Sequence, residues 1–161
     1  MSYKVLLFGE PNAGKTTLLE KFRVDKRTRL DNEESCILLN SNGNLVSLWV
    51  RETHCFTEVE DYHPNAAIVM LCCDPETQQV DLRLIKTYII RIKINYGIIP
   101  IIVCVNKVDR DFSCSWDPMG LNESFGWISC LQERNCENLF SQLYFNMGGD
   151  KNATLIKKVK L

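Results

Sequence analysis

The sequence has no long uninterrupted apolar run and no excess of charge of one sign. Its most apolar stretch, residues 88–105, is broken by charged, amide and proline side chains, which excludes a membrane-spanning helix there. The apolar residues 5–8 stop at Gly9, far short of the apolar part of a secretion signal. Nineteen Lys and Arg against 20 Asp and Glu leave a net charge of −1, which makes no general electrostatic case for nucleic acid or anionic lipid as a partner.

No two of the 8 cysteines have the C-x-x-C spacing of a zinc or redox site. Cys72, Cys73 and Cys104 lie in strand-like apolar runs, so we expect buried thiols in a reducing cytoplasm rather than a disulfide framework. There is no C-terminal cysteine to prenylate, so lipid anchoring by that route is not expected.

What is present is the composition of one globular domain. The 161 residues are 45% hydrophobic and 24% charged, without internal repeats or low-complexity segments. We predict a domain over residues 1–149 and a short basic tail over residues 150–161.

Apolar segments alternate with amphipathic ones along the chain. This alternation predicts an α/β fold with a largely parallel sheet covered on both faces by helices. The charged stretch 23–35 has neither the periodicity of a helix nor that of a strand, and it is predicted to be a loop. A hairpin is expected around Asn42-Gly43, between strands at 36–40 and 45–50. The other predicted strands are 3–8, 66–73, 98–105 and 127–130, and the predicted helices are 15–22, 81–96 and 136–147.

The segment from Gly9 to Thr16 reads G-E-P-N-A-G-K-T and fits the phosphate-binding pattern G-x-x-x-x-G-K-[ST] between a strand and a helix. Gly14 lets the backbone curl so that its N–H groups converge on phosphate oxygens. Lys15 adds a charge at the β- and γ-phosphates, and the Thr16 hydroxyl can ligate Mg²⁺. An ordinary glycine turn is the alternative. The predicted phosphate contacts are Glu10, Pro11, Asn12, Ala13, Gly14, Lys15, Thr16 and Thr17.

The predicted strand 98–105 runs directly into Asn106-Lys107-Val108-Asp109, an N-K-x-D pattern. In GTP-binding proteins the aspartate of this pattern, here Asp109, accepts two hydrogen bonds from guanine. Asn106 would serve guanine N7 and brace the phosphate loop, and the stem of Lys107 would lie along the base. Adenine lacks those donors, so an unpaired buried carboxylate discriminates by on the order of 10⁴. A plain turn with a solvated aspartate is the alternative.

With these two motifs the chain resembles the Ras superfamily of small GTPases over residues 3–147. Within that superfamily it is most similar to the Ras and Rab branches. Ile128-Ser129-Cys130 is similar to the family's S-A-K motif, so the backbone around Ser129 and Cys130 would contact guanine O6. The resemblance implies a three-layer P-loop NTPase fold, a Ras-like G domain over residues 1–149. Its six-stranded mixed sheet would have one antiparallel edge strand, 36–40, and helices on both faces. It also implies GTP or GDP with Mg²⁺ as ligands and protein effectors or regulators as partners.

The switch elements of that family are altered. Its D-x-x-G motif aligns with Val50-Arg51-Glu52-Thr53, so Val50 replaces the aspartate and Thr53 the glycine. His54 follows, where the family keeps a water-positioning glutamine. His54 and Lys15 are the two candidate catalytic residues. A solvated loop histidine is the favoured alternative. Thr28 is the sole candidate for the switch threonine that closes on Mg²⁺.

These changes lead us to expect a guanine-nucleotide-binding protein with weak Mg²⁺ coupling and slow or absent GTP hydrolysis. The alternative is a pseudo-GTPase, a protein-interaction scaffold without a nucleotide cycle. A small-molecule kinase using ATP is disfavoured by N-K-V-D and by the absence of an arginine-rich lid.

The predicted helix 81–96 has a second feature. Ile90 and Ile94 point nearly opposite to its apolar face, so they form a possible contact face for a partner or a second copy. Isolated exposed isoleucines are also common without any function.

Overall fold

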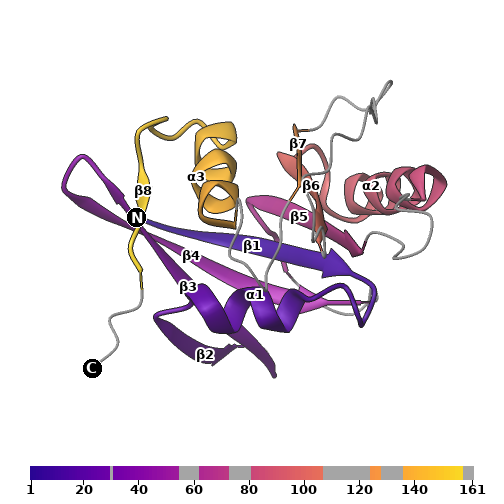
Figure 1. Cartoon of the computed structure of the whole chain (residues 1–161), viewed down its shortest axis with the longest axis horizontal. Coiled ribbons are helices and arrows are strands. Elements are labelled where there is room, and N and C mark those ends of the chain that lie inside the picture. The colour runs from indigo at the N-terminus through magenta and orange to yellow at the C-terminus, as the bar shows by residue number, and fades with distance from the viewer. Residues whose placement is uncertain (30, 55–61, 73–80, 107–123, 128–135, 158–161) are drawn as a thin grey trace.

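The computed structural model describes residues 1–29, 31–54, 62–72, 81–106, 124–127 and 136–157. Within these ranges the chain forms one sheet and three helices (Figure 1). The strands are β1 (Ser2–Gly9), β2 (Asp25–Arg29), β3 (Asn32–Ser41), β4 (Asn44–Thr53), β5 (Ala66–Cys72), β6 (Ile101–Asn106), β7 (Ser124–Trp127) and β8 (Thr154–Leu155). The helices are α1 (Lys15–Phe22), α2 (Leu82–Tyr96) and α3 (Cys136–Asn146).

Seven strands lie on one path in the order β2-β3-β4-β1-β5-β6-β7, and β8 pairs with β3. The central strand β1 is parallel to both neighbours, with Leu7 opposite Glu52 of β4 and Ile68 of β5. The β5–β6 and β6–β7 pairs are also parallel. The carboxyl ends of β1, β4, β5 and β6 therefore meet at one edge of the sheet, which is where ligands bind in open α/β sheets.

The two faces of β1 carry two separate hydrophobic clusters. Val5 and Leu7 pack in the cluster that includes side chains of α1 and α3. Leu6 and Phe8 pack in the cluster that includes side chains of α2. Because alternate side chains of a strand point to opposite faces, an all-apolar strand must be covered on both sides. The three described helices supply that cover.

The fold class implied by the resemblance is wrong. A three-layer P-loop NTPase sheet of six strands with one antiparallel edge strand was expected. The sheet instead has seven strands on one path plus β8, and three pairs are antiparallel: β2–β3, β3–β4 and β3–β8. The predicted edge segment 36–40 lies within β3, between β2 and β4. What stands is the broader class, an α/β fold with a mixed sheet.

The predicted loop over residues 23–35 is also wrong, because it contains β2 and the start of β3. Every β2 residue except Arg27 is exposed, so no apolar period marks the strand. Polar contacts hold it instead. The Nε of Arg27 donates to Oε1 of the buried Glu34 at 3.1 Å, and its guanidinium lies 3.8 Å from the ring centroid of Trp49. Cross-strand pairs of this kind stabilise a sheet without burying apolar side chains.

Most other element predictions agree with the structure to within a few residues. The hairpin turns through Asn42 and Gly43, whose φ values are 53° and 83°. Helix α2 begins after Asp81, whose carboxylate accepts from the N–H groups of Arg83 and Leu84. Strand β6 begins later than predicted, at Ile101, and Ile98, which the prediction included, is exposed to solvent. Of the predicted strand 127–130, residue 127 ends β7 and the rest lies outside the described residues.

The predicted tail contributes to the sheet. Thr154 and Leu155 pair with Asn40 and Leu39 of β3, and Ile156 N–H donates to Leu38 O at 2.9 Å. No helix in the described ranges is long and apolar enough to cross a membrane.

Candidate phosphate-binding site

The phosphate-loop sequence forms a tight turn between β1 and α1. Ala13 N–H donates to Glu10 O at 3.0 Å, and Leu18 N–H donates to Gly14 O at 3.0 Å as α1 begins. Gly14 has a φ of 97°, the left-handed region that side chains other than glycine rarely adopt. The sequence motif thus folds into a glycine-dependent turn that opens directly onto a helix N-terminus.

The side chain of Lys15 folds back over this turn and is 6% exposed. Its Nζ donates to Gly9 O at 2.5 Å and to Glu10 O at 2.7 Å. Burial lowers the pKa of the Lys15 amine below its ordinary value, and the nearby carboxylates of Glu52 and Glu10 oppose that shift. A buried cation whose hydrogen bonds go to carbonyl oxygens gains strongly from an anionic ligand, because a phosphate would add negative charge at hydrogen-bond distance.

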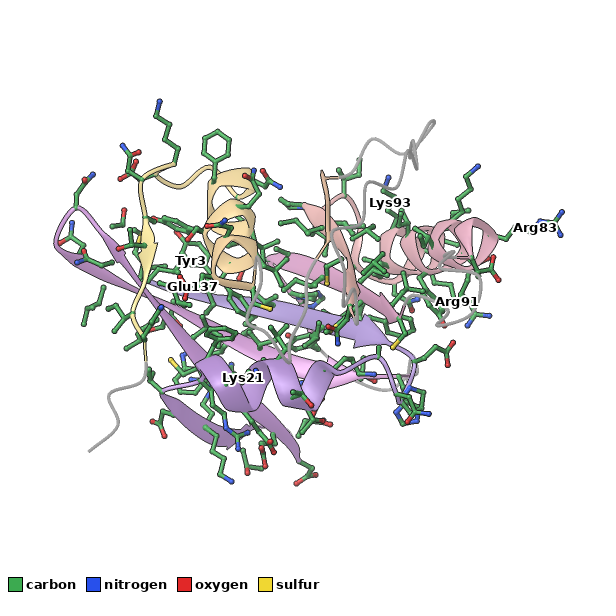
Figure 2. The ribbon with its side chains drawn as sticks, in the orientation of Figure 1. Tyr3, Lys21, Arg83, Arg91, Lys93 and Glu137 are labelled. Atoms are coloured by element: carbon green, nitrogen blue, oxygen red, sulfur yellow. The ribbon has the colours of Figure 1, made fainter. Side chains whose placement is uncertain are left out.

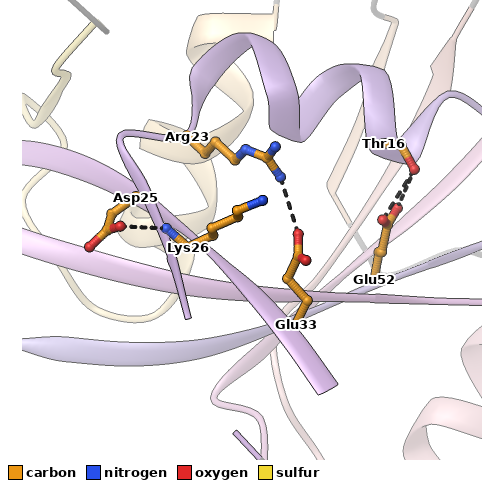
Figure 3. A network of polar contacts seen from close by, with 6 residues as sticks. All are labelled: Thr16, Arg23, Asp25, Lys26, Glu33 and Glu52. Carbon is orange, nitrogen blue, oxygen red and sulfur yellow. Dashed lines mark hydrogen bonds and ion pairs between the residues drawn. The ribbon is translucent and has the colours of Figure 1, made fainter. Parts of the chain in front are cut away.

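Thr16, the first residue after this lysine, meets a carboxylate from β4. Its Oγ1 lies 3.1 Å from Oε1 and 2.9 Å from Oε2 of Glu52 (Figure 3). A hydroxyl and a carboxylate are oxygen ligands of the kind that Mg²⁺ prefers. Among the described residues no group of three or more His, Cys, Asp or Glu side chains could hold a metal. A cation here would therefore depend on Thr16, Glu52 and oxygens brought by the bound phosphates.

The carboxyl end of β6 braces the loop from the other side. Asn106 is 2% exposed, and its Nδ2 donates to Ala13 O at 2.9 Å. This bond joins positions 93 residues apart in the sequence. It places the start of the N-K-V-D segment against the phosphate loop. Lys107 and Asp109 themselves lie outside the described residues, as do Ser129 and Cys130.

Helix α2 and β5 also contact the loop. The hydroxyl of Tyr88 donates to the Glu10 carboxylate, and the Tyr88 ring packs edge-on against Phe8 at 4.8 Å between centroids. Burial, then the hydrogen bond to Glu10, raises the pKa of the Tyr88 hydroxyl, so it stays a donor. The thiol of Cys72 donates to Asn12 O at 3.0 Å. Side chains from four elements, β4, β5, β6 and α2, therefore contact the phosphate-loop motif between β1 and α1.

The remaining predicted site residues lie apart from the loop. Thr28 is exposed on β2, opposite Glu33, with β3 and β4 between it and β1. His54 is exposed just beyond the end of β4. Val50, aligned with the family's aspartate, is completely buried in the core. The residue of this part of β4 that reaches the phosphate-loop motif is Glu52, through Thr16.

Glu52, Tyr88 and Cys72 are the loop contacts that sequence reasoning missed. Of these three, only Glu52 could have been found from the sequence, by its position at the end of a predicted strand. Val50 and Glu52 point to the same side of β4, since alternate residues of a strand share a face. Val50 lies inside the core, and Glu52 lies one step further along, beyond the core and opposite Thr16. An acidic residue at the carboxyl end of a strand beside the phosphate loop marks that position better than the literal D-x-x-G pattern.

No model of a known protein family matches the chain, and no curated protein matches it.

Proposed function

We propose that this protein binds a guanine nucleotide, with its phosphates in the loop between β1 and α1. The observation that carries the proposal is the Asn106–Ala13 hydrogen bond. It brings together the two segments whose sequences suit phosphates and guanine, although they are far apart along the chain. A phosphate loop alone would not distinguish guanine from adenine.

The described residues have distinct roles in this proposal. The backbone of the turn and the buried Lys15 bind the β- and γ-phosphates. Thr16 and Glu52 fit Mg²⁺, which would neutralise phosphate charge. The weak Mg²⁺ coupling expected from the sequence rested on Val50, and Glu52 supplies a carboxylate in its place. Lys107 and Asp109, with Ser129 and Cys130, remain the proposed contacts to the base.

We propose that GTP hydrolysis is slow or absent. Thr53 occupies the place of the glycine that senses the γ-phosphate in the resembled family, and it is paired with Phe8 inside the sheet. A residue fixed in a parallel strand pair has little freedom to follow the loss of a phosphate. This observation also favours the second candidate, a pseudo-GTPase that acts as an interaction scaffold. A reducing, cytoplasmic location is part of the proposal, because Cys36, Cys72 and Cys104 are free thiols.

The first test is to denature the purified protein and identify the released nucleotide by chromatography. We expect GDP or GTP at close to one equivalent per chain. Released ATP would refute the assignment of guanine. If no nucleotide is released, titration with fluorescent GDP decides whether the chain binds guanine nucleotide at all. A chain that fails to bind GDP would be assigned the alternative function, an interaction scaffold. A single-turnover assay with labelled GTP and Mg²⁺ then separates a slow enzyme from a protein that only binds.

Replacing Glu52 by glutamine is expected to weaken Mg²⁺ binding in the nucleotide complex by about 10- to 100-fold. The amide keeps the size of the side chain but removes the charge beside Thr16. Chelating Mg²⁺ is expected to speed the release of the bound nucleotide. The measurement is the Mg²⁺ concentration at which half of the original slow release is restored. Glu33→Gln is the matched control, because Glu33 is exposed on β3 and pairs with Arg23. Equal Mg²⁺ requirements in both variants would exclude Glu52 from the cation site.

A further inference from the structure

Helix α2 combines cationic and large apolar side chains on its exposed side. It contains four cationic residues and no acidic one. Its outward half also carries two large exposed side chains, Ile90 at 56% and Ile94 at 77%. We call this surface the α2 patch; it consists of Arg83, Lys86, Ile90, Arg91, Lys93 and Ile94, all exposed.

The inward half of α2 is fixed in the core. Ile85, Tyr88, Ile89 and Ile92 are buried against the side chains of β1, β5 and β6. The helix cannot rotate to bury Ile90 or Ile94 without exposing these residues. The two exposed isoleucines are therefore a permanent feature of the surface.

The charges of the patch are arranged around its apolar centre. Ile90 and Ile94 lie one helical turn apart along the middle of the exposed face, and Arg83 lies on the same line about two turns before Ile90. Lys86 and Lys93, two turns apart, lie along one border, and Arg91 lies along the other. Figure 2 shows Arg83, Arg91 and Lys93 projecting outward from α2. Ile98, which follows the helix after Gly97, is a further large apolar side chain and is 98% exposed.

We infer that the α2 patch docks this protein on a bilayer that contains anionic lipids. An apolar line bordered on both sides by cations is the arrangement of a helix that lies in the membrane interface. The isoleucines would enter the boundary between headgroups and acyl chains, and the cations would meet headgroup phosphates. A second copy of the chain suits the patch poorly, because a two-fold contact would place four cations against four.

The small net charge of the whole chain does not oppose this inference. At physiological ionic strength charges are screened over about 8 Å, so a membrane senses the charges nearest to it. The positive charge of α2 is balanced by acidic residues elsewhere in the chain. Docking would therefore be oriented, with α2 facing the lipid.

The test is sedimentation of the full chain with vesicles of phosphatidylcholine alone or mixed with phosphatidylserine. We expect binding to the mixed vesicles only, and less of it as salt is raised. Lys86→Gln with Lys93→Gln should lower the partition coefficient by about 30-fold, since each cation near an anionic surface contributes about fivefold. Ile90→Ala with Ile94→Ala should lower it by at least about tenfold, since each methylene that enters the apolar boundary contributes about fourfold.

The matched control is Lys26→Gln with Leu45→Ala, which removes an exposed cation and an exposed large apolar side chain elsewhere on the sheet. It should bind vesicles as the unchanged protein does. Equal binding to pure phosphatidylcholine, or no loss in the α2 variants, would overturn the inference. Tight binding to polyglutamate would also overturn it if the isoleucine variants bound polyglutamate equally well. The partner of the patch would then be an acidic protein. Nucleotide binding should be the same in all these variants, which keeps this test separate from the proposed function.

Discussion

Lys15→Met is expected to weaken nucleotide binding by about 10³-fold while the protein stays folded. Two unit charges about 4 Å apart at an effective dielectric constant of ~20 attract by about 4 kcal/mol, which corresponds to that factor. The Lys15 amine donates to the carbonyls of Gly9 and Glu10, and a bound phosphate would bring a negative charge into direct contact with it. Methionine fills similar space without the charge. Titration with fluorescent GDP or GTP measures the effect.

The matched control is Lys21→Met, the same change in the last turn of α1. It should leave binding unchanged. Unchanged binding in Lys15→Met would instead remove the phosphate site from the proposal. A chain that unfolds would not be informative by itself, so urea denaturation accompanies the titration. We expect the free energy of unfolding to change by less than about 2 kcal/mol, because a lost pair of hydrogen bonds is offset by relief of a buried charge.

The same pair of variants tests the lowered pKa of Lys15. Below its folded-state pKa the amine is charged in both states, and the cost of burying that charge is fully present. As the pH rises from that pKa towards 10.5, the ordinary value for a lysine, the unfolded chain binds a proton that the folded chain has released. Stability of the unchanged protein should therefore rise with pH through this window relative to Lys15→Met. The opposite slope would show that the pKa is raised instead.

Gly14→Ala is expected to lower the free energy of unfolding by about 3 kcal/mol and to abolish nucleotide binding. A methyl group at this φ of 97° costs about 1–2 kcal/mol, and it would lie 2.2 Å from Asn106 Nδ2. The amide must then move, which breaks the bond to Ala13 O and leaves buried polar groups unpaired at about 1–3 kcal/mol. Urea denaturation gives the stability, and fluorescent GDP gives the binding.

Gly43→Ala separates the two causes. Gly43 has a similar φ of 83°, but a methyl group there meets nothing within 4 Å. We therefore expect only the conformational cost of about 1–2 kcal/mol, with binding intact. If the two variants lose the same stability, the contact between Gly14 and Asn106 does not constrain the loop.

Much of the fold could be predicted because apolar patterns mark the buried elements. Strands β1, β5 and β6 and all three described helices were predicted near their observed bounds, since each must bury a continuous face. Strand β2 was missed because its side chains are polar and exposed, and it is held by Arg27 against Glu34 and Trp49. The number of strands and the antiparallel share of the sheet depend on such pairings, so the expected six-stranded sheet was wrong.

The candidate site could be predicted in part for a similar reason. The phosphate loop is local in sequence, so its glycine, lysine and threonine are recognised together. The Glu52–Thr16 and Tyr88–Glu10 contacts join residues from different elements. No local pattern announces them, and alignment to D-x-x-G pointed to Val50, which the strand directs into the core.

The sequence by itself therefore determined the local chemistry of this protein: a phosphate loop after a buried strand, an N-K-V-D segment after another, and a helix with two outward isoleucines. Only the tertiary structure decided that Glu52 rather than Val50 stands opposite Thr16, and that Tyr88 and Cys72 contact the phosphate loop. The physical reason is that chain connectivity fixes which groups are neighbours along a strand or helix. Which strand lies beside which, and which side of a helix the core covers, depends on how all the elements pack together.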